Sequence, residues 1–400
     1  MQSSDIIKFL ESPLAEEMFL KHANSSSEDI VMREKNLNPQ ERRVLASLLQ
    51  LYKKAKEKLP EYVIKHAALN EKSYEQATSS AVAHFRSTLI KANRLLNLSG
   101  GIGADDLELS KTCTHITSVD VDNEVHNLAI YNSVLFKTDN VTRVNAYAED
   151  FIKDCPKFDV IYIDPDRRSK KERTLLLEEA SPNIVELQDQ LLNIANEVYI
   201  KLSPLTDLSE IKSKLRCCQS IWVVALENEV KEVLVKLSRT TNSVNTYAVM
   251  ICSDNTYVVT EDELPLTKLE NKTEIFIEPT AALIKSGLAD HFFLTNNFLK
   301  VGRNAAFYIG NATATLLPGR AFVIVKKMAY KPKLLKQYFY ENGITYGHFK
   351  KRDFPLDVNQ LKQKHKLKDG GNDYFFFYTD LNKTLQVVHA QKPKIKHSLF

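Results

Sequence analysis

The sequence predicts an α/β protein with a doubly wound parallel sheet, preceded by a helical domain and followed by a small α+β module. Short apolar runs alternate with helix-compatible segments between residues 95 and 252, which is typical of a parallel sheet. Residues 1–80 have helical spacing of apolar residues, and the C-terminal part has a distinct, basic composition. The predicted domains are a helical domain at 1–80, a sheet domain at 81–253, a short segment at 273–316 and a basic module at 317–400.

The N-terminal domain is predicted to be helical because its apolar side chains recur at helical spacing. Pro39 opens a segment in which Val44, Leu45, Leu48 and Leu49 lie on one face, and Pro60 ends it. The first residues carry neither a basic start nor an apolar run, and no apolar run approaches the length of a membrane span. We therefore expect a cytoplasmic protein.

The sheet domain is predicted to contain seven strands, the last of them antiparallel. The apolar runs that carry this prediction lie at 95–98, 116–119, 141–145, 160–163, 198–202, 221–226 and 247–252. Ligands of open α/β sheets bind at the carboxyl ends of such strands. The loops after the first five runs are therefore the places to search for a site.

A Gly-rich turn follows the first predicted strand. The dinucleotide-binding fingerprint is Gly-x-Gly-x-x-Gly, and here Asp106 stands in the place of its third glycine. The turn also lacks the Gly-Lys-Ser/Thr ending of a Walker loop. The Gly-Gly-x-Gly turn is similar to the turn of class I S-adenosylmethionine (SAM) methyltransferases. In those enzymes an acid at the end of the second strand accepts hydrogen bonds from the ribose of the cofactor. An ordinary strand-to-helix loop is the alternative. The candidate cofactor residues here are Asn97, Ser99, Gly100, Gly101, Gly103, Asp120 and Val121.

Three further residues are candidate cofactor contacts by position. Arg86 lies on the helix before the first strand, where it can pair with the cofactor carboxylate or simply lie on the protein surface. Tyr147 and Ala148 follow the third strand, where a side chain and the next backbone N–H usually contact the adenine. Tyr147 replaces the common acid, so we expect it to stack on the base.

The end of the fourth strand carries the predicted catalytic residues Asp164, Pro165, Asp166 and Arg167. Amino-directed methyltransferases use Asp/Asn-Pro-Pro-aromatic at this position, and this chain keeps the first half. Arg167 can stack on a base while Arg168, Lys170 and Lys171 meet phosphates. An aspartate cap followed by a solvated basic loop is the alternative. Neither interpretation needs a metal ion, and the cysteine spacing suggests no metal site.

The C-terminal part is basic although the whole chain has a net charge of only +4. Residues 318–400 contain seventeen Lys and Arg against six Asp and Glu, a net charge of +11, so the other residues sum to −7. This asymmetry is typical of a nucleic-acid-binding appendage, with a solvated lysine-rich face as the alternative. Of the aromatic run at 374–378 we expect most members in the core, which makes the lysines the better RNA candidates.

Motifs along nearly the whole length resemble one known family. They are Glu75-Gln76-Ala77-Thr78-Ser79-Ser80, the Gly-rich turn, Asp164-Pro165-Asp166-Arg167-Arg168, Lys201-Leu202-Ser203-Pro204, Glu227-Asn228-Glu229, Glu278-Pro279-Thr280-Ala281, Pro318-Gly319-Arg320, Arg352-Asp353-Phe354-Pro355 and Lys368-Asp369-Gly370-Gly371. The chain resembles bacterial class I SAM-dependent methyltransferases that have a ferredoxin-like segment and a C-terminal THUMP-like domain.

This resemblance implies a Rossmann-like seven-stranded core, SAM as cofactor, and RNA methylation, since THUMP domains present RNA to attached catalytic domains. The leading hypothesis is an enzyme that methylates an exocyclic amine in structured tRNA or rRNA, bound through the basic module and the loop at 167–171. Two departures, Asn97 for an acid and Asp166 for a small residue, motivate a second hypothesis, a non-catalytic RNA-binding or assembly protein. A methyltransferase for a small molecule or a protein is the third.

Overall fold

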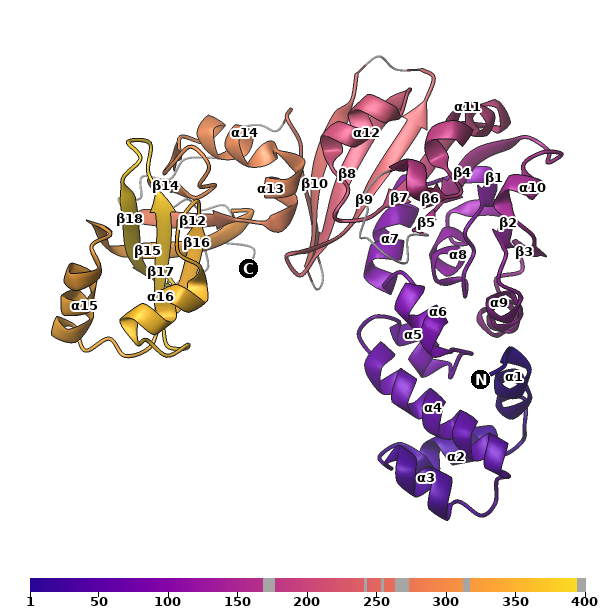
Figure 1. Cartoon of the computed structure of the whole chain (residues 1–400). Helices are drawn as coiled ribbons and strands as arrows, with labels where there is room; N and C mark the ends of the chain where they lie inside the picture. The colour runs from indigo at the N-terminus through magenta and orange to yellow at the C-terminus, as the bar shows by residue number, and fades with distance from the viewer. Residues whose placement is uncertain (168–176, 241–242, 253–254, 263–272, 312–316, 394–400) are drawn as a thin grey trace. The chain divides into compact units, whose positions relative to one another are not determined.

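The computed structural model describes residues 1–167, 177–240, 243–252, 255–262, 273–311 and 317–393. The chain forms two compact units, Met1–Ile221 with Glu232–Val244 and Trp222–Lys231 with Asn245–Phe400 (Figure 1). The predicted basic residues Arg168, Lys170 and Lys171 lie outside the described residues.

The first unit begins with a set of short helices around one long helix. Their bounds are α1 (Ser3–Leu10), α2 (Ala15–His22), α3 (Ser27–Arg33), α4 (Pro39–Ala55), α5 (Pro60–Ile64) and α6 (Glu71–Gln76). Asn38 caps α4 with a reciprocal capping box, and Pro39 occupies its first turn, where its missing N–H costs no hydrogen bond. The predicted apolar face of α4 is buried. It shares one core with Ile102, Ala104, Val125 and Leu128 of the sheet domain.

The helix α7 (Ser80–Leu89) leads into a large mixed sheet, which confirms the α/β fold class. The strands are β1 (Ala92–Asn97), β2 (Cys113–Asp120), β3 (Val141–Asn145), β4 (Phe158–Ile163), β7 (Ala195–Leu202), β8 (Cys218–Leu226), β9 (Glu229–Ser238), β10 (Asn245–Cys252) and β11 (Asn255–Val259). Their order is β11-β10-β8-β9-β7-β4-β1-β2-β3. Pairing is parallel from β3 to β7, so the carboxyl ends of these strands share one edge.

The strand that runs antiparallel beside β7 is β9, which the sequence analysis did not include. The predicted seventh strand at 247–252 is β10, which lies on the far side of β8 in the sheet order. Glu229, Lys231, Glu232 and Lys236 interrupt the apolar pattern of β9 and explain why it was missed. One of these charged residues, Glu232, is buried, and it forms an ion pair with Arg86 that no local sequence pattern reveals.

The connections place helices against the sheet and a small hairpin at its carboxyl edge. They are α8 (Ala104–Leu109), α9 (Asn123–Phe136), α10 (Ala148–Phe151), α11 (Ile184–Ile194), α12 (Leu208–Lys214), the short helix η1 (Leu177–Glu179) and the paired strands β5 (Asp166–Arg167) and β6 (Ala180–Ser181). Central strands such as β4 are buried on both faces, which is why their sequences are nearly continuous apolar runs.

The second unit contains a seven-stranded sheet in the order β13-β14-β12-β15-β18-β17-β16. Its elements are β12 (Glu274–Pro279), α13 (Ala281–Ser286), α14 (Leu288–Thr295), β13 (Leu299–Lys300), β14 (Tyr308–Asn311), β15 (Gly319–Ala329), α15 (Pro332–Glu341), β16 (His348–Arg352), α16 (Val358–His365), β17 (Asp373–Thr379) and β18 (Leu385–Gln391). The side chains of Phe375, Phe376 and Phe377 are fully buried. The prediction that this aromatic run forms core is therefore confirmed.

The described residues include no helix with the length and apolar character that a membrane crossing requires.

Candidate active site

A cavity of about 560 Å³ lies at the carboxyl ends of β1, β2, β3 and β4. Its volume is within the usual range for small-molecule sites. The structure brings nine of the predicted site residues to its wall: Ser99, Gly101, Asp120, Val121, Tyr147, Ala148, Asp164, Pro165 and Asp166. Residues from four separate strand ends therefore converge on one space, as expected for the ligand edge of an open α/β sheet.

The carboxylate of Asp120 is held by two backbone groups. The Gly101 N–H donates to Oδ2 at 2.7 Å, and the Asp122 N–H donates to Oδ1 at 2.8 Å. A carboxylate has further lone pairs, so Asp120 can still accept hydrogen bonds from a ligand in the cavity. Gly101 has a φ of +50°, and no atom lies within 4 Å of the position that a Cβ would take. The turn thus leaves open space beside a fixed acceptor.

Arg143, on β3, supports the Gly-rich turn from behind. Its Nη2 pairs with Asp106 Oδ2 at 2.9 Å, and its Nη1 donates to the Gly101 carbonyl at 3.3 Å and to Ser118 Oγ at 3.1 Å. Sequence analysis missed this residue. A single arginine between the two valines of the strand Val141–Asn145 is the signal that could have found it.

The arginine explains two of the glycines. A Cβ on Gly100 would lie 2.5 Å from Arg143 Nη1, and a Cβ on Gly103 would collide with Nη2. Gly103 also has a φ of +88°, which side chains other than glycine rarely adopt. Both glycines and Asn97 lie outside the cavity wall and shape the turn instead.

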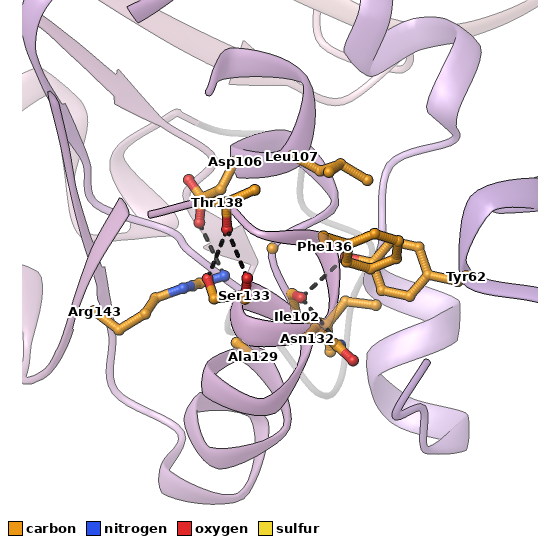
Figure 2. Close-up of a pocket in the computed structure, with 11 residues that line it drawn as sticks. Tyr62, Ile102, Asp106, Leu107, Ala129, Asn132, Ser133, Phe136, Thr138 and Arg143 are labelled. Atoms are coloured by element: carbon orange, nitrogen blue, oxygen red, sulfur yellow. Dashed lines mark hydrogen bonds and ion pairs between the residues drawn. The ribbon is translucent and has the colours of Figure 1, made fainter. Parts of the chain in front are cut away.

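Figure 2 shows the pocket behind this turn, with Arg143 joined to Asp106 on one side. On the other side Tyr62, from α5, donates its hydroxyl to the Ile102 carbonyl at 3.1 Å. Asn132, from α9, reaches the same carbonyl at 3.5 Å. One helix of the N-terminal set, α5, and the helix α9 therefore both hold the backbone of the Gly-rich turn.

Asn97 is fully buried at the end of β1. Its Nδ2 donates to Asp106 Oδ1 at 2.7 Å, and its Oδ1 accepts the Ser99 N–H at 3.0 Å. An amide can donate and accept at once, whereas a carboxylate at this position would repel Asp106. The side chain thus acts on the turn through Asp106 and Ser99 rather than by facing the cavity.

Arg86 differs most from its predicted position. Its guanidinium is fully buried, pairs with Asp105 and with Glu232, and lies 4.7 Å over the ring of Tyr162. It does not line the cavity. Burial raises the pKa of Glu232, and Arg86 opposes this by stabilising the ionised form. In this structure Arg86 pairs with the buried Glu232 and the partly buried Asp105, and it lies outside the cavity wall.

Asp164 is held by both its backbone and its side chain. Its N–H donates to Ser99 Oγ at 2.7 Å, and its Oδ2 is paired with Lys201 at the end of β7. Burial opposes the charged form of Lys201, but the carboxylates of Asp164 and Glu232 outweigh it, so the pKa of Lys201 is raised. Sequence analysis placed the loop at 201–204 at this edge but did not foresee the ion pair.

The next residues of the predicted catalytic segment form a small hairpin. In β5, Asp166 pairs with Ser181 and Arg167 pairs with Ala180 of β6. Asp166, Ser181 and Pro182 all line the cavity. The backbone pairing fixes where Asp164 and Pro165 leave β4, so these residues have a defined position at the cavity wall.

Two further cavity residues come from the helix α6 or its end. Lys72 pairs with Asp122, and this hydrogen bond is the main reason why the pKa of Lys72 is raised. Gln76 also lines the cavity. It belongs to the motif at 75–80 that supported the family resemblance, although sequence analysis gave it no role. Among the residues that the structure describes, no group of three or more His, Cys, Asp and Glu could hold a metal ion.

Comparison with known proteins identifies the fold. A family model described as THUMP domain-like matches residues 319–392. A crystal structure described as a "putative methyltransferase from Porphyromonas gingivalis W83" is 23% identical, with a TM-score of 0.83 over 98% of this chain and 100% of that chain. These findings confirm the expected resemblance: a methyltransferase-like α/β fold with a THUMP-like C-terminal domain.

Two other similar structures overlap much less. A "putative class I S-adenosylmethionine-dependent methyltransferase" from Listeria monocytogenes is 11% identical, with a TM-score of 0.34 over 63% of this chain and 92% of that chain. A "putative RNA methyltransferase" from Pyrococcus horikoshii is 13% identical, with a TM-score of 0.29 over 40% of this chain and 84% of that chain. A search of curated proteins finds no match to the chain.

Proposed function

We propose that this chain is a SAM-dependent methyltransferase that methylates an exocyclic amine of a base in tRNA or rRNA. The observation that carries the proposal is the convergence of the Gly-rich turn, Asp120 and the Asp164-Pro165-Asp166 segment on one cavity. This places an open backbone turn, a fixed carboxylate and a second carboxylate around a single ligand-sized space. The three features lie at the ends of three separate strands, β1, β2 and β4, so their convergence is a property of the fold.

The cavity residues suit the parts of SAM. Asp120 offers acceptor lone pairs for a ribose diol, since only one backbone N–H occupies each of its oxygens. The ring of Tyr147 is 56% exposed at the cavity wall and is available to stack on an adenine. Arg86 is buried and paired, so we assign the carboxylate end of the cofactor to other groups; Lys72 and Gln76 are polar side chains of the cavity wall that can take this role.

When bound, SAM supplies an activated methyl group, so the protein mainly has to orient the acceptor. In our proposal the carboxylate of Asp164 and the carbonyl of Pro165 accept hydrogen bonds from the target amine. Lys201 limits the rotation of the Asp164 side chain through their ion pair. Ser99 fixes the backbone at the same point by accepting the Asp164 N–H.

The RNA part of the proposal rests on charge. The C-terminal module has a net charge of +11 whereas the other residues sum to −7, and its aromatic run is buried, so the lysines remain to meet phosphates. A match to a THUMP domain-like model over 319–392 supports the same assignment. The basic loop at 167–171 is a second proposed RNA contact.

A non-catalytic RNA-binding or assembly protein is the second candidate function. One observation favours it: the carboxylate of Asp164 is already paired with Lys201, which competes with a target amine for the same oxygen. The presence of Asn97, where the resembled family usually has an acid, also favours this candidate. In this candidate the fold is retained while transfer is lost.

Calorimetric titration of the full chain with SAM tests the proposal. We expect saturable binding that Asp120→Ala weakens at least about tenfold, because a charge-assisted hydrogen bond contributes about 1.5–3 kcal/mol. The control is Asp154→Ala, which removes an exposed aspartate outside the cavity. Absence of SAM binding in a folded, cofactor-free preparation would overturn the methyltransferase proposal and leave the non-catalytic candidate.

A further inference from the structure

A second cavity, of about 440 Å³, lies within the THUMP-like part of the second unit. It is lined by residues of α15, the end of α16 and the segments 344–346 and 366–368. No predicted site residue lies in it. It does contain the start of the Lys368-Asp369-Gly370-Gly371 motif, to which the proposed chemistry assigns no role.

The wall of this cavity has one sign of charge. Lys336, Lys366 and Lys368 line it and are exposed, and no acidic residue belongs to the wall. Within the described part of the chain, none of the three lysines forms an ion pair. The neighbouring carboxylate of Asp369 is neutralised by Lys362, whose Nζ lies 2.6 Å from Oδ2. An anion is therefore the ligand that this wall favours.

A buried histidine belongs to the cavity wall and has one ring nitrogen without a hydrogen-bond partner. His365 is only 6% exposed, and its Nε2 lies 3.1 Å from the hydroxyl of Tyr330. Its Nδ1 has no hydrogen-bond partner. The rings of Tyr330 and Phe339 hold the imidazole edge-on at centroid distances of 5.8 Å. A buried polar atom without a partner is unusual, and His365 belongs to the wall of this cavity.

Tyr346 presents an aromatic face beside the lysines. Its side chain is 49% exposed although it lines the cavity. A Cβ on Gly371 would lie 3.3 Å from the Cβ of Tyr346, so the glycine lets the turn pass close to the ring's base. A parallel bridge joins Tyr346 to Lys368. The ring and the lysine are therefore held at neighbouring positions by their backbones.

We propose that this cavity binds one unstacked nucleotide of a single-stranded RNA segment. The base stacks on Tyr346, the phosphate lies among Lys336, Lys366 and Lys368, and Nδ1 of His365 hydrogen-bonds to the base or the sugar. This inference rests on the proposed RNA function and specifies it. Duplex RNA can offer phosphates to lysines, but only an unpaired nucleotide can also reach an aromatic face and a recessed histidine.

Fluorescence anisotropy with a labelled 12-nucleotide single strand tests the proposal in the full chain. We expect Lys366→Gln/Lys368→Gln to weaken binding by about tenfold, because it removes two cations of the proposed phosphate contact. We expect Tyr346→Ala to weaken binding by about tenfold as well, since stacking contributes about 1–3 kcal/mol per base. The matched control is Lys331→Gln/Lys333→Gln, which removes the same charge from exposed lysines at the start of α15 and outside the cavity. Equal weakening by both double variants would overturn the proposal in favour of general charge attraction. The variants are also measured with a duplex of the same sequence. Equal weakening of duplex binding and single-strand binding would also overturn the proposal.

A second measurement reports on the histidine. Imidazole NMR signals of the full chain, with His365 identified from the His365→Gln spectrum, are followed during titration with cytidine monophosphate and with inorganic phosphate. We expect the His365 signal to shift with the nucleotide and to shift less with phosphate alone. An unchanged signal with both probes, or equal shifts with both, would contradict a nucleotide site. Calorimetric titration of the same variants with SAM separates the nucleotide site from the proposed methyltransferase function. Variants that bind SAM normally and keep their RNA affinity would refute the nucleotide site and leave the methyltransferase proposal standing.

Discussion

Arg86 Nη2 and Glu232 Oε2 lie 2.5 Å apart, although 146 positions separate the two residues in the chain. Both side chains are buried, on α7 and β9 respectively. Asp105 pairs with the same guanidinium, and the Tyr162 hydroxyl reaches Asp105 at 3.2 Å. The ion pair joins the helix before the first strand to the antiparallel strand, close to the Asp164–Lys201 pair.

Removing this arginine is expected to destabilise the first unit. Arg86→Met leaves Asp105 and Glu232 buried without their cation, which costs about 3–5 kcal/mol in comparable buried pairs. Thermal unfolding followed by circular dichroism measures the effect. The double variant Arg86→Met/Glu232→Leu is expected to recover part of the loss, because it removes one of the two uncompensated charges. Equal melting temperatures for the single and double variants would contradict the pairing.

Alanine at Gly103 is expected to disrupt the Gly-rich turn. The residue has a φ of +88°, and the added Cβ would collide with Arg143. The control is Gly343→Ala, where φ is +64° but no atom lies within 4 Å of the new Cβ. Positive φ costs a non-glycine residue about 1–2 kcal/mol in both variants, so any larger loss at Gly103 reports on the collision. Calorimetry with SAM is expected to detect weakened binding in Gly103→Ala alone.

Substitution at Asp164 is expected to separate cofactor binding from transfer. In Asp164→Asn the amide keeps the shape, but its one oxygen turns to accept from Lys201, so an NH2 donor takes the place of the oxygen that would accept from the target amine. We expect SAM affinity within about threefold of the unmodified chain. Transfer of labelled methyl groups to undermethylated RNA should fall by about a hundredfold, because misplacement of the target amine by a small distance can cost that much in rate. Unchanged transfer would remove Asp164 from the proposed active site.

Lys201→Met tests whether the lysine orients Asp164. We expect reduced transfer with SAM affinity retained, because the side chain acts through Asp164 and does not line the cavity. Lys201→Arg is the conservative variant that should restore part of the activity. Loss of transfer in Lys201→Met without any rescue by arginine would point to a steric effect instead of the ion pair.

Acid is expected to weaken the fold around His365. Burial, followed by the charges of Lys336 and Lys364, lowers the pKa of His365 from 6.5 to about 4. The unfolded chain therefore takes up this proton near pH 6.5, whereas the folded chain resists it until about pH 4. Stability should fall across that interval by up to about 3 kcal/mol. Thermal unfolding between pH 7 and 4 measures it, and His365→Phe should flatten the slope.

Local patterns predicted much of the fold and of the cavity. The turn after β1, the acid about twenty residues later and the Asp-Pro sequence after β4 could each be identified within a short window, because turn chemistry and strand periodicity are local properties. Their convergence follows from the rule that parallel strands end at one edge. The burial of Phe376 likewise follows from its position in an apolar run.

The pairing of buried charges could not be predicted in this way. Arg86 was expected to face a cofactor, and Glu232 lay in a strand that its own charges concealed. Local sequence describes a side chain's type but not which distant carboxylate lies beside it. Burial of a charge depends on such a partner, since an unpaired one is too costly.

The sequence by itself determined the α/β class, the basic C-terminal module and the segments that form the cavity, because these depend on composition and periodicity. Only the tertiary structure decided that Arg143 supports the turn, that Lys201 holds Asp164 and that His365 lines a second cavity and has one buried nitrogen without a partner. These relationships join residues from different elements. Their geometry is set by how the helices and strands pack, which no single stretch of sequence encodes.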